Sequence, residues 1–247
     1  GHTTPVFGDA STLIIGSPAL GDTGTIAAAS GGAFGGDGDD TLTGGAGGDV
    51  LQGNQGNDSL VGGGGNDTIF GGKDNDHIDV GTGGNFAQGN LGNDTITAAT
   101  STSSNILLGG QGDDNITCGT GNDILSGDLG NDTISGGNGA DSLAGVGGDD
   151  SIIGGTGNDI IDGGTGNDTI TNGGGAGSDK ITGGDGDDNI TASGTGANNV
   201  AGNAGNDTIT VSADGADTVL GGPGAATIHP RGPGPDILNG NLGDDVI

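Results

Sequence analysis

The stretch GGTGNDIIDGGTGNDTI, residues 154–170, contains nearly the same nine residues twice. Each copy reads Gly-Gly-x-Gly-x-Asp-x-aliphatic-x, and we number these repeat positions 1 to 9. With repeat position 6 as the marker, the sequence holds 23 copies between Asp40 and Asp245, and 19 of the markers are Asp. The residue two places after the marker is Leu, Ile or Val in every copy except the one with Ala87. A period held this strictly predicts a repeat architecture.

The nine-residue unit suggests how the chain folds. The three residues x-aliphatic-x are long enough for a short strand whose middle side chain points inward. The six-residue glycine-rich segment then reverses the chain, because glycine allows positive φ and close backbone approach. Two nonapeptides make one 18-residue coil, and stacked coils form two parallel sheets over a thin aliphatic core. We therefore predict an all-β parallel β-solenoid of about 12 to 13 coils.

The insertions divide the turns into two groups. Marker spacing departs from nine only before even-numbered copies, namely those of Asn105, Asp179, Asn198, Asp217 and Asp236. We call the turns that end at odd-numbered markers, such as Asp40 and Asp58, the first edge, and those that end at even-numbered markers the second edge. The first edge is predicted to hold strict spacing, and the second to tolerate variation.

The charge is carried by one residue type. All 33 acidic residues are Asp, against 3 Lys and Arg, and the formal net charge is −30. Short carboxylates at fixed turn positions suit metal ligation in tight loops. The charge argues against nucleic acid or an anionic membrane as partner. No apolar run approaches the roughly 18 residues that span a bilayer, so no membrane insertion is expected.

Stacking places the marker carboxylates about 4.8 Å apart along an edge, where they repel one another. A hard divalent cation held by carboxylates and backbone carbonyls would bind the coils together, and calcium tolerates irregular oxygen cages better than magnesium. We predict about 12 Ca2+ ions, about nine on the first edge and three on the second, with folding coupled to binding. A gap or weakened site is expected beside Ala226. The predicted ligands are Asp40, Asp49, Asp58, Asp67, Asp76, Asp94, Asp114, Asp123, Asp132, Asp141, Asp150, Asp159, Asp168, Asp188, Asp207 and Asp245.

Over residues 35–247 the nonapeptides resemble the RTX (repeats-in-toxin, hemolysin-type calcium-binding) family. The resemblance implies a β-roll with calcium in its turns, in a bacterial protein that is exported unfolded by type I secretion and folds in extracellular calcium. Residues 1–34 fit only loosely, as degenerate N-terminal coils or a cap in which Leu13, Ile26 and Phe34 are candidate inward residues. The expected location is secreted, extracellular or at the cell surface.

Almost the whole chain is repeat, and no catalytic triad forms around His2, His77 or His229, so we expect no enzyme. The favoured function is a calcium-binding structural protein, as a surface-layer, adhesin or filament component. Such a protein would self-associate end to end or laterally, or continue into a larger chain. The competing function is a calcium-dependent folding and secretion module of a larger secreted enzyme or toxin.

The two outward faces are predicted to differ. Repeat positions 7 and 9 of odd copies are rich in Thr, and we call this the hydroxyl face. It resembles ice-binding solenoid faces, although strand propensity alone explains Thr there. The corresponding positions of even copies form an apolar face that is a candidate for lateral packing. Its apolar members are Val50, Phe70, Phe86, Ile106, Leu108, Ile124, Ile160 and Leu220.

Overall fold

The structure is a computed structural model, and it describes residues 12–17, 21–26, 30–213, 215–231 and 234–247. All elements within these ranges are β-strands, which alternate along the chain between two parallel sheets, A and B. No helix capable of crossing a membrane occurs in the described part of the chain. The chain divides into two compact units, residues 1–121 and 122–247.

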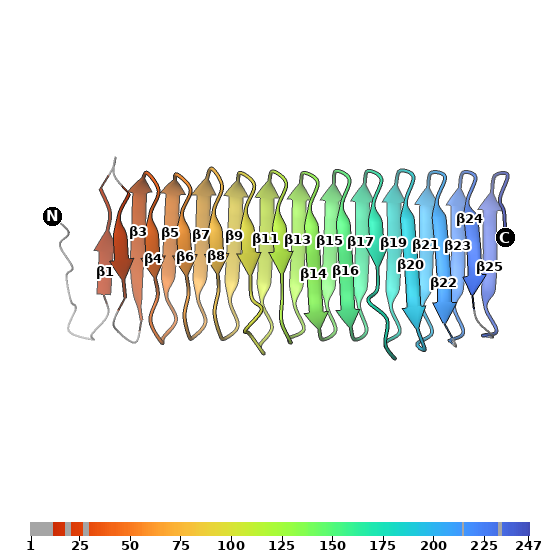
Figure 1. Ribbon diagram of the computed structural model, residues 1–247, viewed down its shortest axis with the longest axis horizontal. Coiled ribbons are helices and arrows are strands. Elements are labelled where there is room, and N and C mark those ends of the chain that lie inside the picture. The colour runs from red at the N-terminus through yellow and green to blue at the C-terminus, as the bar shows by residue number, and fades with distance from the viewer. Residues whose placement is uncertain (1–11, 18–20, 27–29, 214, 232–233) are drawn as a thin grey trace. The chain divides into compact units, whose positions relative to one another are not determined.

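In the first unit, successive strands of each sheet lie side by side (Figure 1). Its sheet A consists of β1 (Thr12–Ile15), β3 (Gly31–Asp37), β5 (Val50–Gln55), β7 (Thr68–Lys73), β9 (Phe86–Leu91) and β11 (Ile106–Gln111). Its sheet B consists of β2 (Thr23–Thr25), β4 (Thr41–Thr43), β6 (Ser59–Val61), β8 (His77–Asp79), β10 (Thr95–Thr97) and β12 (Asn115–Thr117).

The second unit repeats this arrangement. Its sheet A consists of β13 (Ile124–Leu129), β15 (Ser142–Gly147), β17 (Ile160–Thr165), β19 (Lys180–Asp185), β21 (Asn199–Ala204), β23 (Thr218–Pro223) and β25 (Ile237–Leu242). Its sheet B consists of β14 (Thr133–Asn138), β16 (Ser151–Thr156), β18 (Thr169–Thr171), β20 (Asn189–Gly194), β22 (Thr208–Ala213) and β24 (Thr227–Arg231). The predicted all-β solenoid with 18-residue coils is confirmed in both units.

The prediction of three-residue strands is wrong for sheet A and for most sheet B strands of the second unit. β5 spans six residues, repeat positions 7 to 3, so the chain reverses only over positions 4 to 6. The extra length follows from pairing, because β5 stays in register with β7 as far as Gln55 opposite Lys73. In the first unit, the described strands of sheet B keep the predicted three residues, as in β10.

Each regular repeat contributes one inward side chain to the core, at repeat position 8, and β20 and β22 also bury Ala192 and Val211. Leu51, Ile69 and Ile134 are fully buried, and each such burial contributes about 1.5–3 kcal/mol. Before the regular repeats, Ile26 is buried as predicted, but Ile14 and Ala33 are buried in place of Leu13 and Phe34. The error is one of register, since a shift by one residue moves a side chain to the other face of a sheet.

The insertions all lie in turns that lead from sheet B to sheet A, which is the second edge. The two longest, residues 98–105 after β10 and residues 172–179 after β18, extend at the lower side of Figure 1. Turns from sheet A to sheet B form the first edge and keep a constant length. The predicted difference between the edges is therefore confirmed in each unit.

Repeat position 2 requires a left-handed backbone, and Val146 is poorly suited to it. Its φ is +84°, whereas Asn54, Asn90 and Asn203 fill the same repeat position elsewhere. A β-branched residue at positive φ is strained by about 1–3 kcal/mol. We expect Val146→Asn to increase the free energy of unfolding by about 1 kcal/mol. Thermal unfolding at fixed calcium would show this increase as a higher midpoint temperature. Val146→Ala is the control, since it keeps a Cβ, and an equal gain from it would contradict the strain.

Candidate metal centre

The marker residues of each unit, most of them Asp, form ladders of side-chain to backbone hydrogen bonds. The amide of Asp40 donates to Oδ1 of Asp58 at 2.7 Å, and the amide of Asp58 donates to Oδ1 of Asp76 at 2.8 Å. On the second edge, the amide of Asp141 donates to Oδ1 of Asp159 at 3.0 Å. Each of these three carboxylates thus accepts a hydrogen bond from the coil before it. The general preference of Asp for turns rests on bonds within one turn and does not require this bond between coils.

The other carboxylate oxygen of these residues is buried and has no hydrogen-bond partner among the described residues. Leaving a buried polar atom unpaired costs about 1–3 kcal/mol, and more for a charged group. An unpaired buried carboxylate oxygen recurs at successive markers along an edge, and this pattern indicates that the carboxylates bind a cation. The residues are Asp40, Asp49, Asp58, Asp67, Asp76, Asp94, Asp141, Asp150, Asp159, Asp168, Asp188 and Asp207, the unpaired atom being Oδ1 in Asp49 and Oδ2 in the others.

A backbone carbonyl of the next coil lies beside the carboxylate in many first-edge turns. A Cβ on Gly53 would lie 2.0 Å from Oδ2 of Asp58 and 2.7 Å from the carbonyl oxygen of Gly71. The same pair of oxygens surrounds Gly163, at 2.3 Å for Oδ2 of Asp168 and 2.4 Å for the Gly183 carbonyl. Glycine at repeat position 1 therefore leaves the space in which these two oxygens meet.

This donor set fits calcium, which prefers hard oxygen ligands and accepts backbone carbonyls. Among the described residues no three His, Cys, Asp or Glu side chains gather at one point, so carbonyl donors must complete any site. When bound, calcium supplies the positive charge that the buried carboxylates lack. The residues that would hold it are the marker Asp and the carbonyl of repeat position 1 in the following coil.

The structure places the other predicted ligands as follows. Asp114, Asp123 and Asp132 are buried at the marker position like the rest. Asp245 is half-buried, and its Oδ1 accepts the amide of Ala226 at 3.0 Å. All sixteen predicted residues thus occupy turns, but their coordination of metal stays a prediction.

The second edge contains two kinds of turn, which the residue at repeat position 1 distinguishes. Where that residue is glycine, as at Gly136 and Gly154, the marker is Asp with an unpaired oxygen. In other turns a buried side chain stands there, and the residues are Val80, Ala98, Cys118, Asn172, Ala192 and Val211. In the turn of Asp123, repeat position 1 is Cys118. The turns of the other predicted ligands on this edge have glycine at that position.

Two marker carboxylates were missed by the sequence prediction. The amide of Asp22 donates to Oδ1 of Asp40 at 2.6 Å, so the ladder begins one coil before the regular repeats. Its distance of 18 residues from Asp40 is the signal that could have found it. Asp217 also has a buried Oδ2 without a partner, although its turn carries an insertion and Val211 at repeat position 1.

Burial raises the pKa of several marker carboxyls, Asp76 and Asp150 among them. It raises the pKa of Asp76 to about 8 and that of Asp150 to about 7. The backbone hydrogen bond from the preceding coil lowers both values, and the charges of neighbouring aspartates raise them further. Asp58, with the same causes in the same order, has a pKa of about 6.

These pKa values predict how pH affects the calcium-free chain. A carboxyl whose folded pKa exceeds its unfolded value of 3.8 stabilises the fold below that value, and the contribution is lost as pH rises through about 6 to 8. Acidification from about pH 8 to about pH 4.5 should therefore increase β structure without calcium. Circular dichroism would measure it, with light scattering to exclude aggregation, and a signal that stays constant or falls would contradict it.

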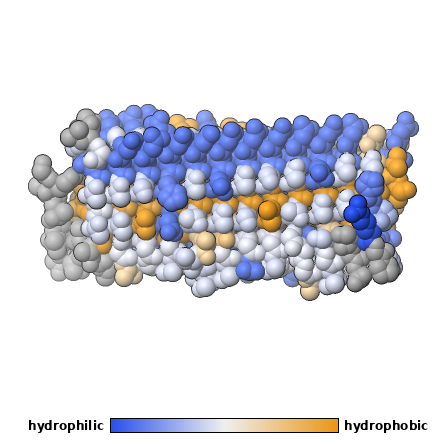
Figure 2. Space-filling view, viewed as in Figure 1, coloured by the Kyte–Doolittle hydropathy of each residue, from blue (hydrophilic) through white to orange (hydrophobic). Residues whose placement is uncertain are grey.

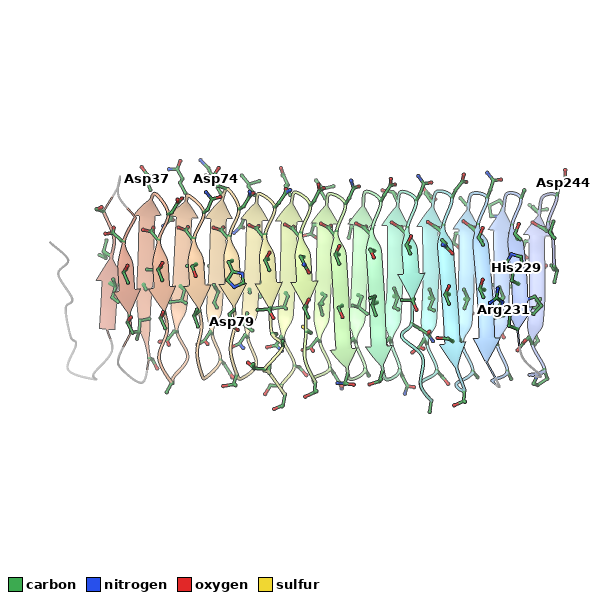
Figure 3. The ribbon with its side chains drawn as sticks, in the orientation of Figure 1. Asp37, Asp74, Asp79, His229, Arg231 and Asp244 are labelled. Atoms are coloured by element: carbon green, nitrogen blue, oxygen red, sulfur yellow. The ribbon has the colours of Figure 1, made fainter. Side chains whose placement is uncertain are left out.

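A second ladder runs along the first edge at repeat position 5, in the opposite direction. The amide of Asn75 donates to Oδ1 of Asn57 at 3.0 Å, and the amide of Asn93 donates to Oδ1 of Asn75 at 2.7 Å. Each of these side chains thus binds the coil that follows it. Figure 2 shows a strongly hydrophilic upper edge, and Figure 3 labels Asp37 and Asp74 on the same side.

Ala226 interrupts the first-edge column between Asp207 and Asp245. It is buried at the marker position and offers no side-chain oxygen, although Gly221 leaves repeat position 1 open. We expect Ala226→Asp to bind one more calcium ion and to gain roughly 1.5–3 kcal/mol in stability. Ala226→Asn restores the hydrogen-bond acceptor without the charge and should add no ion. Metal analysis and thermal unfolding would measure both variants, and an unchanged ion count in Ala226→Asp would refute the expectation.

Comparison with known families supports a calcium site. The model of the RTX calcium-binding nonapeptide repeat, which covers four copies, matches residues 34–69, 43–78, 52–87, 79–101, 100–134, 135–170, 174–194, 193–228 and 232–247. A search of curated proteins finds no match. The matched segments include every turn with an unpaired buried carboxylate oxygen described above.

Proposed function

Because the chain belongs to the RTX calcium-binding nonapeptide repeat family, we propose that it is an extracellular structural protein that folds on binding about 12 calcium ions and assembles with further copies. RTX repeats bind Ca2+ and are typical of secreted bacterial proteins. The observation that carries the proposal is the column of buried carboxylates with unpaired oxygens. Low cytosolic calcium would leave this acidic chain unfolded, and external calcium would close it.

Assembly is supported by the outer surface of sheet A. Val50, Ile106, Ile124 and Ile160 are each 40% exposed or more on this apolar face. The rings of Phe70 and Phe86 pack against each other there, with centroids 5.8 Å apart. Apolar patches on a surface that is otherwise polar favour protein contacts. We propose lateral packing through this face.

End-to-end association is the second mode of the proposed assembly. β25 is the outermost strand of its sheet, with Ile237 64% and Leu242 74% exposed. A second copy that pairs its first strand with this edge would cover both side chains. The competing function, a folding module of a larger secreted enzyme or toxin, predicts a monomer instead.

The experiment compares two charged variants in millimolar calcium by electron microscopy and sedimentation. Ile106→Asp with Leu108→Asp places two charges on the apolar face, and Thr95→Asp with Thr97→Asp places two on the hydroxyl face. We expect calcium-dependent polymers from the wild type and the threonine variant, and fewer or none from the first. A wild type that is strictly monomeric at high calcium would overturn the assembly proposal and favour the module.

The proposal assigns no catalytic activity to the chain. His77 and His229 are both exposed on strands of sheet B, and His2 lies outside the described residues. The hydroxyl face has the predicted alternation, with Ile96 buried between the outward Thr95 and Thr97. Ice binding by that face stays a prediction, which a thermal hysteresis measurement on calcium-loaded protein would decide.

A further inference from the structure

The turn that joins β18 and β19, residues 172–179, is held by a buried asparagine. Asn172 stands at repeat position 1, where the preceding second-edge turn has Gly154, and its side chain is completely buried. Its Nδ2 donates to Oδ2 of Asp179 at 2.8 Å and to the carbonyl oxygen of Ser193 at 2.8 Å. One amide group therefore bridges the marker carboxylate of its own turn and a backbone carbonyl of the next coil.

The acceptor side of the same amide is also paired. Oδ1 of Asn172 accepts bonds from the amide of Gly174 at 3.2 Å and from the amide of Ser193 at 2.9 Å. Exchanging the oxygen and nitrogen would place donors against donors, so the orientation of the group is determined. The side chain thus binds the coil of Ser193 through both of its ends.

Asp159 and Asp179 differ in how their carboxylates are satisfied. Oδ1 of each accepts the amide of the preceding marker, at 3.0 Å for Asp159 and 2.8 Å for Asp179. Oδ2 of Asp159 is buried without a partner, whereas Oδ2 of Asp179 accepts the bond from Asn172. The protein therefore satisfies both oxygens of Asp179 and only one oxygen of Asp159, which leaves the cost of an unpaired buried oxygen at Asp159 alone.

We propose that Asn172 takes the place of the cation in this turn, so that residues 172–179 join the following coil without calcium. The amide contacts the carboxylate of its own turn and a backbone carbonyl of the next coil. The same two kinds of oxygen flank the spaces beside glycine at repeat position 1 in other turns. The inference rests on calcium binding by the repeats and is independent of the proposed assembly. It makes the second edge a mixture of metal-dependent and metal-independent junctions.

Native mass spectrometry of the calcium-loaded full chain tests this with matched Asp→Asn variants. Asp150→Asn, on the first edge, is expected to lose one ion, and failure to do so would refute calcium binding itself. Asp159→Asn is also expected to lose one ion, while Asp179→Asn keeps the wild-type count. An ion lost from Asp179→Asn, or none lost from Asp159→Asn, would overturn the replacement role of Asn172.

A second pair of variants changes the asparagine itself. Asn172→Asp has the same shape but no hydrogens to donate, so it is expected to bind one additional calcium ion and to approach wild-type thermal stability only as calcium rises. Asn172→Ala should keep the ion count and show a loss of stability that is the same at every calcium concentration. If Asn172→Asp gains no ion and behaves like Asn172→Ala, the side chain is an ordinary hydrogen-bonding residue and the proposal fails.

Discussion

Removal of calcium is expected to unfold the chain. At a calcium concentration 100 times the dissociation constant, each site stabilises the fold by about 2.7 kcal/mol. A few such sites equal the 5–15 kcal/mol that holds a typical domain together. Dialysis against EGTA at low ionic strength should abolish the β signal in circular dichroism and expand the chain in small-angle scattering.

Readdition of ions provides the control for that experiment. Calcium should restore both signals, whereas magnesium at equal concentration should restore little, because magnesium demands near-ideal octahedral geometry and dehydrates reluctantly. A chain that keeps its β structure and compactness after exhaustive EGTA treatment would contradict the role assigned to the aspartate column.

Gly163→Ala is expected to destabilise the fold strongly and to weaken one calcium site. The new Cβ would lie 2.3 Å from Oδ2 of Asp168 and 2.4 Å from the Gly183 carbonyl, which belongs to the backbone and cannot rotate away. We expect a loss of about 3 kcal/mol or more, together with one calcium ion. Urea unfolding at fixed calcium and metal analysis would measure the two effects.

Gly154→Ala is the matched control on the second edge. Its Cβ would lie 2.8 Å from Oδ2 of Asp159 and 3.2 Å from the Asn172 carbonyl. Neither glycine has a positive φ, so backbone conformation does not separate the two variants. Equal losses from both would show that the close approach of oxygens at Gly163 has no special cost.

The regular part of the fold could be predicted because spacing alone aligns equivalent residues. An 18-residue coil places Asp40 beside Asp58, and the alternation of inward and outward residues identifies Leu51 and Ile69 as core. Asp22 was not recognised as a marker because Gly24 stands two residues later, where the repeat has an aliphatic residue. Phe34 was predicted to point inward, but the register of the strand assigns that place to Ala33.

The rest depends on atoms that no local pattern brings together. The strands of sheet A extend beyond three residues because their pairing with neighbouring strands continues to repeat position 3, as it does from β5 to β3 and β7. The network of Asn172 joins residues seven and twenty-one positions apart across an inserted loop. Insertions shift such contacts out of the period, so the three-dimensional arrangement is needed to find them.

The alternation of strands between two sheets also limits how a gene for this chain can change in length. Duplication or loss of a single nonapeptide would exchange the edges for every later repeat and bring turns such as residues 98–105 into the column that begins with Asp40 and Asp58. Recombination in steps of two nonapeptides leaves both hydrogen-bonded ladders and both faces in phase. Copy number should therefore vary among descendants of this sequence in whole coils of 18 residues.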